Sequence, residues 1–315
     1  MLEQLPRAVF SLLGGSALLA RLASGYGLRR PDSFARRFIA GETTADAIRA
    51  ARILEQAGLT VSFDQLGEHV TTTAAATAAT RAYLDVVDQM KQAGIAGQLS
   101  VKLTQLGIDV DRATSIDNLR RILDGAGNAG YFVRVDMERS TYTAQTLDAF
   151  ETAWNIGYRN SGVAIQAYLR RSATDVARLN ALGASVRLVK GAYHEPRDVA
   201  FQHKAEVDDS FKQLAQLLLM HGTSPAIATH DPDMIAETIR FAAGQQIPKD
   251  RYEFELLYGV RRDLQTTLAA DGHRVRIYVP FGTQWFPYFM RRLGERPANV
   301  GFVLKSIMRE GERST

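Results

Sequence analysis

Two adjacent arginines near the end of the chain, Arg291 and Arg292, are placed to bind a small carboxylate. They close an apolar helical stretch that follows a strand-like run, 273–280, and a Pro-Phe-Gly turn. A strand that ends in such a turn leaves its last side chains, Tyr278 among them, at the mouth of a sheet, and guanidinium groups bind carboxylates in a bidentate manner. Glu295 follows them by four and three positions, the spacing at which an acid holds a helical arginine. A solvated basic turn paired with one acid is the alternative.

A second candidate site is the loop after the run 184–190. Lys190 ends this run and Gly191 and Ala192 follow it directly, so a lysine stands beside small residues whose backbone amides an anion can approach. Thr229, His230 and Asp231 end the next run and could contact the same anion. The segment predicts either a phosphate site or a tight turn without ligand.

A third motif, Gly125-Ala126-Gly127-Asn128-Ala129-Gly130, matches the dinucleotide pattern G-x-G-x-x-G. That pattern works only where the glycines follow a strand and open a helix, because the helix N-terminus must face the pyrophosphate. Here they close a helical stretch and precede the run 131–138, so we reject this function. The six histidines form no close helical pair, and we expect no metal site.

These residues lie on a regular alternation of strand-like and helical stretches. Strict alternation of this kind predicts a parallel sheet, and eight units over some 230 residues fit a closed (β/α)8 TIM-type barrel preceded by N-terminal helices. A doubly wound open sheet is the alternative. We expect a helical arm over 1–57 and the catalytic barrel over 58–315. The strand-like runs are 59–66, 99–106, 131–138, 162–169, 184–190, 225–230, 251–258 and 273–280.

Polar side chains gather near the ends of these runs. In a (β/α)8 barrel the reactive groups lie at the carboxyl ends of the strands, whereas the lumen is otherwise packed with branched aliphatic residues. Each charged residue there is therefore paired or functional. The set is Asp64, Lys102, Asp136, Glu138, Gln166, Arg187, Lys190, His230, Asp231, Glu255 and Tyr278.

Composition indicates a globular protein, with 46% hydrophobic and 23% charged residues in 315. The net charge is +4 with no basic run beyond pairs, so nucleic-acid binding is not expected. The lack of cysteine excludes disulfides and thiolate chemistry. The apolar stretch 8–20 is a poor signal peptide because Arg21 follows it. No apolar stretch reaches spanning length, so we expect a cytoplasmic protein with at most peripheral contact at the inner face of the membrane.

As a set, the strand ends resemble those of the proline dehydrogenase family, in its monofunctional bacterial form. The segments that carry the resemblance run in order from residue 100 to residue 295. They are 100–103, 135–138, 164–168, 187–193, 228–230, 276–283 and 291–295.

The resemblance implies a distorted (β/α)8 barrel that binds FAD and oxidises L-proline to Δ1-pyrroline-5-carboxylate, the first step of proline catabolism to glutamate. The hydride would pass to flavin N5 and the electrons to a membrane quinone. A downstream pyrroline-5-carboxylate dehydrogenase is then a candidate partner. His194 departs from the family, where an aromatic residue often follows the Lys-Gly-Ala-Tyr segment.

The resemblance also implies roles for individual residues. Asp136 and Arg187 match catalytic positions, with Glu295 supporting the arginines. The substrate would be bound by Lys102, Tyr278, Tyr288, Leu257, Arg291 and Arg292. The flavin would be contacted by Met137, Gln166, Arg187, Lys190, Gly191, Ala192, Thr229 and His230.

Two other functions remain open from the residues alone. A Schiff-base aldolase on the same barrel would use Lys102 or Lys190 as its nucleophile. A protein that binds RNA or membrane through the N-terminal arginines, such as Arg29 and Arg30, would depend on residues 1–57. A yellow, flavin-bearing preparation would favour the dehydrogenase over both.

Overall fold

The structure is a computed structural model that describes residue 28 and residues 33–294. Eight parallel strands close into a barrel in sequence order, and the last strand pairs with the first. The closed barrel confirms the predicted (β/α)8 fold. The strands are β1 (Thr60–Gln65), β2 (Gly97–Val101), β3 (Phe132–Val135), β4 (Ser161–Gln166), β5 (Ser185–Val189), β6 (Ala226–Ala228), β7 (Glu253–Leu257) and β8 (Arg274–Phe281).

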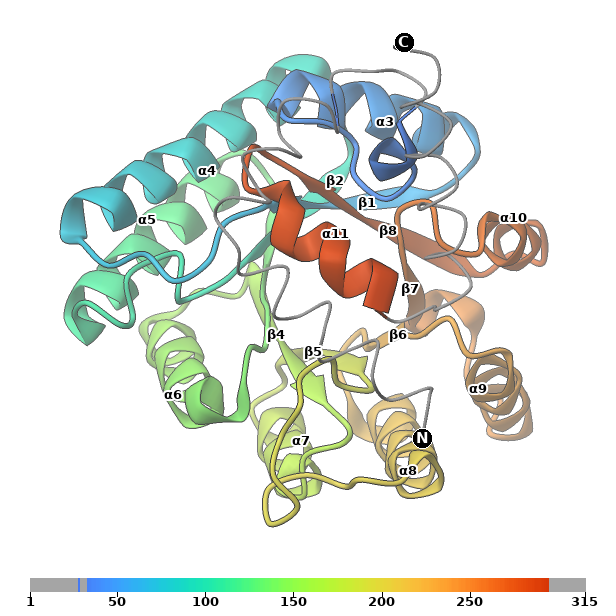
Figure 1. Cartoon of the computed structure of the whole chain (residues 1–315). Helices are drawn as coiled ribbons and strands as arrows, with labels where there is room; N and C mark the ends of the chain where they lie inside the picture. Colours follow the sequence, from blue (N-terminus) through green and yellow to red (C-terminus); the bar gives the residue numbers. More distant parts are fainter. Residues whose placement is uncertain (1–27, 29–32, 295–315) are drawn as a thin grey trace, which may run out of the picture.

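Helices surround the barrel, and one helix, α11, crosses in front of the strands (Figure 1). The α-helices are α3 (Thr44–Gln56), α4 (Thr73–Ala93), α5 (Arg112–Asn128), α6 (Ser140–Ile156), α7 (Ser172–Ala181), α8 (Lys204–His221), α9 (Pro232–Gly244), α10 (Arg262–Ala270) and α11 (Trp285–Gly294). Short 3-10 helices span Phe34–Arg37 (η1) and Lys249–Arg251 (η2). None of the helices in the described ranges is long and apolar enough to cross a membrane.

The helices form where the apolar pattern has helical spacing and a polar residue caps the first turn. In α4, Tyr83, Val86 and Met90 are buried against the barrel, as their spacing predicts. The side chain of Thr72 accepts a hydrogen bond from Ala75 N and so caps this helix. Gly94 ends it in the left-handed conformation, with φ 66°, which glycine adopts without steric cost.

The first 57 residues contribute at least one helix to the barrel wall. Helix α3 contacts β1 and β8, and its buried Ala47 and Ala51 belong to the same hydrophobic core as Val61 of β1. Residues 1–27 and 29–32 of the predicted helical arm over 1–57 lie outside the described residues, and its boundary with the barrel over 58–315 stays a prediction.

Several predicted runs extend past the ends of their strands, the runs 131–138 and 162–169 by three residues and the run 99–106 by five. The run 99–106 continues as an apolar alternation, but β2 ends at Val101 and the chain turns. Leu106 N donates to the carbonyl oxygens of Lys102 and Leu103, which closes a helical turn. The alternation persists because Leu103 and Leu106 are buried in the core beneath this turn. Lys102 is therefore the first residue after the strand, at the mouth of the barrel.

The glycine-rich segment 125–130 closes α5 and precedes β3. This placement agrees with our prediction that it is not a dinucleotide-binding motif. Gly125 lies where α5 packs on α4. A Cβ atom there would lie 2.5 Å from a methyl group of Leu84. Gly125 therefore serves close packing of α5 on α4.

Candidate active site

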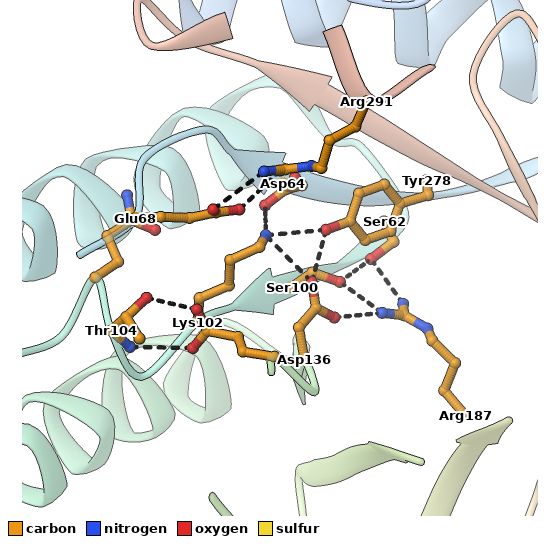
Figure 2. Close-up of polar contacts among 12 residues, drawn as sticks. Ser62, Asp64, Glu68, Ser100, Lys102, Thr104, Asp136, Arg187, Tyr278 and Arg291 are labelled. Atoms are coloured by element: carbon orange, nitrogen blue, oxygen red, sulfur yellow. Dashed lines mark hydrogen bonds and ion pairs between the residues drawn. The ribbon is translucent and has the colours of Figure 1, made fainter. Parts of the chain in front are cut away.

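Charged side chains from several strands meet inside the barrel, and Lys102 is at the centre of this group (Figure 2). Its ammonium group donates to Asp64 Oδ1 at 2.7 Å, to Tyr278 Oη at 3.2 Å and to Asp136 Oδ2 at 3.3 Å. The Lys102 side chain is 8% exposed. Burial alone would lower the pKa of Lys102, but Asp64, Tyr278 and Asp136 together raise it well above its ordinary value. Lys102 is thus a fixed ammonium ion whose three N–H donors all have partners.

Arg187 of β5 lies across the lumen from Lys102 and is held at both edges. Its Nη1 donates to Asp136 Oδ1 at 2.6 Å and to Ser100 Oγ at 3.1 Å, while Nη2 lies 3.4 Å from Ser62 Oγ. On the other edge, Glu255 Oε2 lies 2.5 Å from Nε. Because Ser62 and Ser100 belong to β1 and β2, which are not neighbours of β5, these contacts must cross the barrel interior.

Tyr278 of β8 connects the two cations. Its hydroxyl donates to Asp136 Oδ2 at 2.6 Å, and its ring lies 5.3 Å from the Arg187 guanidinium carbon and 5.9 Å from Lys102 Nζ. Burial and the adjacent Asp136 carboxylate raise the pKa of Tyr278 well above its ordinary value. Tyr278 is therefore a neutral phenol, and it presents an aromatic surface between two fixed positive charges.

Arg291 of α11 reaches the same region but has a partner that we did not predict. Its guanidinium forms a bidentate pair with Glu68, with Nη2 at 2.9 Å from Oε1 and Nη1 at 3.3 Å from Oε2 (Figure 2). Burial opposes ionisation of Glu68, but Arg291 outweighs it and the pKa of Glu68 is lowered. Glu295, the predicted partner, lies outside the described residues. Glu68 follows β1 in a loop and carries no sequence signal of its own.

The other residues that the resemblance assigns to substrate binding differ in burial. Tyr288 is buried in α11, and the Arg292 guanidinium lies 5.1 Å from its ring centroid. Leu257, at the end of β7, is half-buried. Its backbone N–H donates to His230 Nε2 at 2.9 Å, which fixes the imidazole beside this strand end. Arg291 and Arg292 lie on one helix, and Arg291 contacts Glu68 in the loop after β1.

The loop after β5 also carries the predicted anion-binding residues. Lys190 Nζ pairs with Asp231 Oδ2 at 2.6 Å and with Asp208, and Lys204 contacts the same two carboxylates. Burial would raise the pKa of Asp231, but Lys190 outweighs it and lowers that pKa to about 2. Two lysines and two aspartates therefore form a compact cluster at this mouth. We did not predict the two carboxylates as partners of Lys190.

Gly191 and Ala192 are exposed, and Gly191 lies against the ring of Tyr168. A Cβ atom at Gly191 would lie 2.4 Å from Tyr168 Cδ1, and its φ of 122° disfavours any L side chain. Only glycine fits here. The backbone at Gly191 is thus left open on its exposed side, where a ligand can approach it.

The remaining predicted flavin contacts are buried at neighbouring strand ends. Gln166 Nε2 donates to the Glu138 carbonyl at 2.8 Å. The Thr229 hydroxyl accepts from Asp231 N at 3.1 Å. Met137 is 7% exposed and belongs to the main core. Among the described residues, no three side chains are grouped so that they could hold a metal ion.

Comparisons with known proteins agree with this geometry. The family model described as proline dehydrogenase matches residues 47–305. Proline dehydrogenase 1 of Bacillus subtilis is 39% identical over 304 residues, which cover 96% of this chain and 99% of the relative. Proline dehydrogenase of Deinococcus radiodurans is 39% identical over 281 residues, 88% of this chain and 91% of the relative.

A solved structure has the same barrel. It is proline utilization A (PutA) from Bdellovibrio bacteriovorus, inactivated by N-propargylglycine, with a TM-score of 0.77 and 29% identity. The match covers 82% of this chain but only 32% of that protein. The family model and the two full-length relatives, taken with the closed barrel, establish that this chain belongs to the proline dehydrogenase family.

Proposed function

We propose that the protein oxidises L-proline to Δ1-pyrroline-5-carboxylate with FAD as its cofactor. The observation that carries the proposal is the group of fixed cations at one barrel mouth in a chain of this family. Lys102, Arg187 and Arg291 lie there around the neutral Tyr278. Such a site suits an amino-acid carboxylate and an electron-accepting ring that gains negative charge on reduction.

We assign the substrate carboxylate to Lys102, Arg291 and Arg292. Each of the first two has acceptors of its own in this structure, so the carboxylate must replace one of them. The contact of Lys102 with Asp136 is its longest, at 3.3 Å, so this is the contact that the substrate carboxylate would replace. The proline ring would then lie against Tyr278, Tyr288 and Leu257.

The residues present fit FAD. The exposed backbone at Gly191, where a Cβ would meet Tyr168, leaves room for a phosphate, and Lys190 and Lys204 supply two ammonium groups beside it. Arg187 would face the flavin ring, with Gln166, Met137, Ala192, Thr229 and His230 lining the rest. When bound, FAD supplies the acceptor for a hydride from the carbon next to the ring nitrogen of proline.

The chain's own residues position and polarise the substrate. Lys102 and the two arginines of α11 would hold the substrate carboxylate, which places the ring nitrogen and the carbon next to it for oxidation of the neutral amine. Tyr278 fixes the plane of the ring, and Arg187 stabilises the negative charge that arises on reduction. Asp136 holds Lys102, Arg187 and Tyr278 together through both its oxygens.

The aldolase alternative is disfavoured by the electrostatics of its lysines. A Schiff-base nucleophile must be a neutral amine, whereas the pKa of Lys102 is raised well above its ordinary value. Lys190 is likewise bound between the carboxylates of Asp208 and Asp231. Both residues suit anion binding better than attack on a carbonyl.

We further propose that a membrane quinone takes the electrons, through peripheral contact at the inner face of the cell membrane from the cytoplasm. A downstream pyrroline-5-carboxylate dehydrogenase would consume the product, and no nucleic-acid partner is expected. Turnover assays that compare soluble quinones with artificial dyes as electron acceptors would test this class of acceptor. Loss of turnover with every quinone but not with dyes would remove quinone from the proposal.

The decisive experiment is a visible spectrum of the purified protein before and after L-proline is added without oxygen. We expect flavin absorbance that bleaches with L-proline and not with D-proline. A colourless protein that fails to take up added FAD would refute the cofactor. A yellow protein that L-proline leaves oxidised would refute the substrate, and borohydride trapping of a keto acid would then favour the aldolase.

A further inference from the structure

We propose that Glu255 is a positioning residue that holds the Arg187 guanidinium and, through its charge, lowers the reduction potential of the bound flavin. This inference rests on the proposed function, because it requires Arg187 to face the flavin ring. Glu255 precedes the proposed substrate residue Leu257 by two positions on β7. The chemistry of proline binding by itself assigns no role to Glu255.

The geometry around Glu255 is that of a built contact. Its side chain is 2% exposed, and Oε2 lies 2.5 Å from Arg187 Nε. The other oxygen, Oε1, accepts from Gln98 Nε2 at 3.3 Å. Both oxygens thus have a partner, which holds the carboxylate in place, and its contact with the Nε edge of the guanidinium is an ion pair.

The opposite edge of Arg187 is held by Asp136 Oδ1 at 2.6 Å and by Ser100 Oγ at 3.1 Å. The guanidinium therefore lies between two carboxylates. Asp136 shares its second oxygen with Lys102 and Tyr278, so its charge is already divided among several groups. Glu255 contacts no other cation at ion-pair distance within the described residues, so its charge acts chiefly on Arg187.

The two carboxylates decide how much positive charge Arg187 presents to a ring beside it. A guanidinium stabilises the negative charge of a reduced flavin and so raises its potential, and a buried carboxylate next to the guanidinium opposes that effect. Burial raises the pKa of Glu255 above its ordinary value, and Arg187 opposes this shift without cancelling it. The ion pair with Arg187, at 2.5 Å, is what favours the carboxylate form. Replacing Glu255 by a neutral isostere should therefore raise the flavin potential.

A purely structural role makes a different prediction, and the chain offers a matched control. Glu253 lies two residues earlier on the same strand and is also buried. It pairs with Arg276 at 2.9 and 3.0 Å, whereas the carboxylate beside Arg187 Nε is that of Glu255. If Glu255 only stabilised the barrel, E255Q and E253Q would both lower the stability of the fold. The flavin reduction potential would then be the same in the two variants.

The experiment measures the flavin potential of the wild-type holoenzyme, E255Q and E253Q by equilibration with reference dyes, without proline. We expect E255Q to shift the redox equilibrium at least tenfold toward the reduced flavin, about 30 mV for a two-electron couple. We expect E253Q to shift it less than threefold. Flavin content and thermal unfolding of each variant are recorded beside the potential.

An unchanged or lowered potential in E255Q, or an equal rise in E253Q, would overturn the inference. If E255Q does not retain flavin, E255D replaces it. This variant keeps the charge but withdraws it from Nε, so a smaller rise supports the inference and no rise overturns it. A wild-type protein that binds no flavin, or that L-proline does not reduce, would sink the proposed function instead, whereas failure of E255Q alone would leave that function intact.

Discussion

Replacing Gly191 by alanine tests whether the loop after β5 forms part of a cofactor site. At this position a Cβ atom would lie 2.4 Å from Tyr168 Cδ1 and 2.6 Å from two further ring atoms. The ring cannot retreat easily, because Tyr168 is 7% exposed and its backbone is hydrogen-bonded on both sides, to the Lys190 carbonyl and from Phe201 N. The backbone at Gly191 must therefore move.

The expected cost has two parts. A non-glycine residue at a positive φ costs about 1–2 kcal/mol. Forcing a methyl group into a packed ring adds about 1–3 kcal/mol. Gly157 supplies the control, since its φ is also 122° and a Cβ there would meet nothing within 4 Å. The free energy of unfolding should therefore fall by the first part alone in G157A. In G191A it should fall by the sum of both parts, about 2–5 kcal/mol.

Two measurements separate these contributions. Thermal unfolding should show a larger loss in G191A than in G157A, at about 2 °C per kcal/mol for a chain of this size. Flavin content, measured as visible absorbance per protein, should stay at the wild-type level in G157A. In G191A the apparent flavin affinity should fall about tenfold or more, since each tenfold corresponds to about 1.4 kcal/mol. Equal stability and equal flavin content in the two variants would refute the reasoning.

Three further changes have definite expected outcomes. Lys102→Met should raise the proline KM about 10-fold to 100-fold without loss of flavin, because a charged hydrogen bond contributes about 1.5–3 kcal/mol; a wild-type KM would remove Lys102 from the site. Arg291→Met and Arg292→Met should act likewise in steady-state kinetics, and unchanged KM values for both would exclude them. Asp231, whose pKa is lowered to about 2, adds stability that is present above its ordinary pKa and lost as pH falls from about 4 toward 2. Urea unfolding of Asp231→Asn across this range should lack that loss, and a parallel decline in both proteins would contradict it.

The barrel could be predicted because its signal is local and repeated. Each parallel strand is buried on both faces and reads as a short apolar run, and a helix of regular amphipathic pattern follows it. The end of β2 was missed for the same reason, since Leu103 and Leu106 stay buried after the strand has ended and extend the apolar alternation into a turn. An apolar alternation indicates which residues are buried, and residues can stay buried beyond the end of a strand.

The polar strand ends could be predicted as a group, but their pairings could not. Parallel strands of a closed barrel end at one mouth, so Lys102, Asp136, Arg187 and Tyr278 had to lie near one another. The partner of Arg291 is different, because Glu68 lies 223 positions away in a loop whose path no pattern specifies. The sequence offered Glu295 at helical spacing instead, a local choice that ignores the approach of α11 to the β1 loop.

This missing information changes the electrostatic interpretation of the site. The sequence places one acid, Glu295, beside the two arginines that were expected to bind the substrate carboxylate. In the structure each of the three central cations already has a carboxylate partner, so a bound carboxylate must replace an internal anion, and its gain is only the difference between two ion pairs. Modest substrate affinity with tight positioning follows, which suits catalysis better than tight binding of the ground state. The ion pairs concerned are Lys102 with Asp64 and Asp136, Arg187 with Asp136 and Glu255, and Arg291 with Glu68.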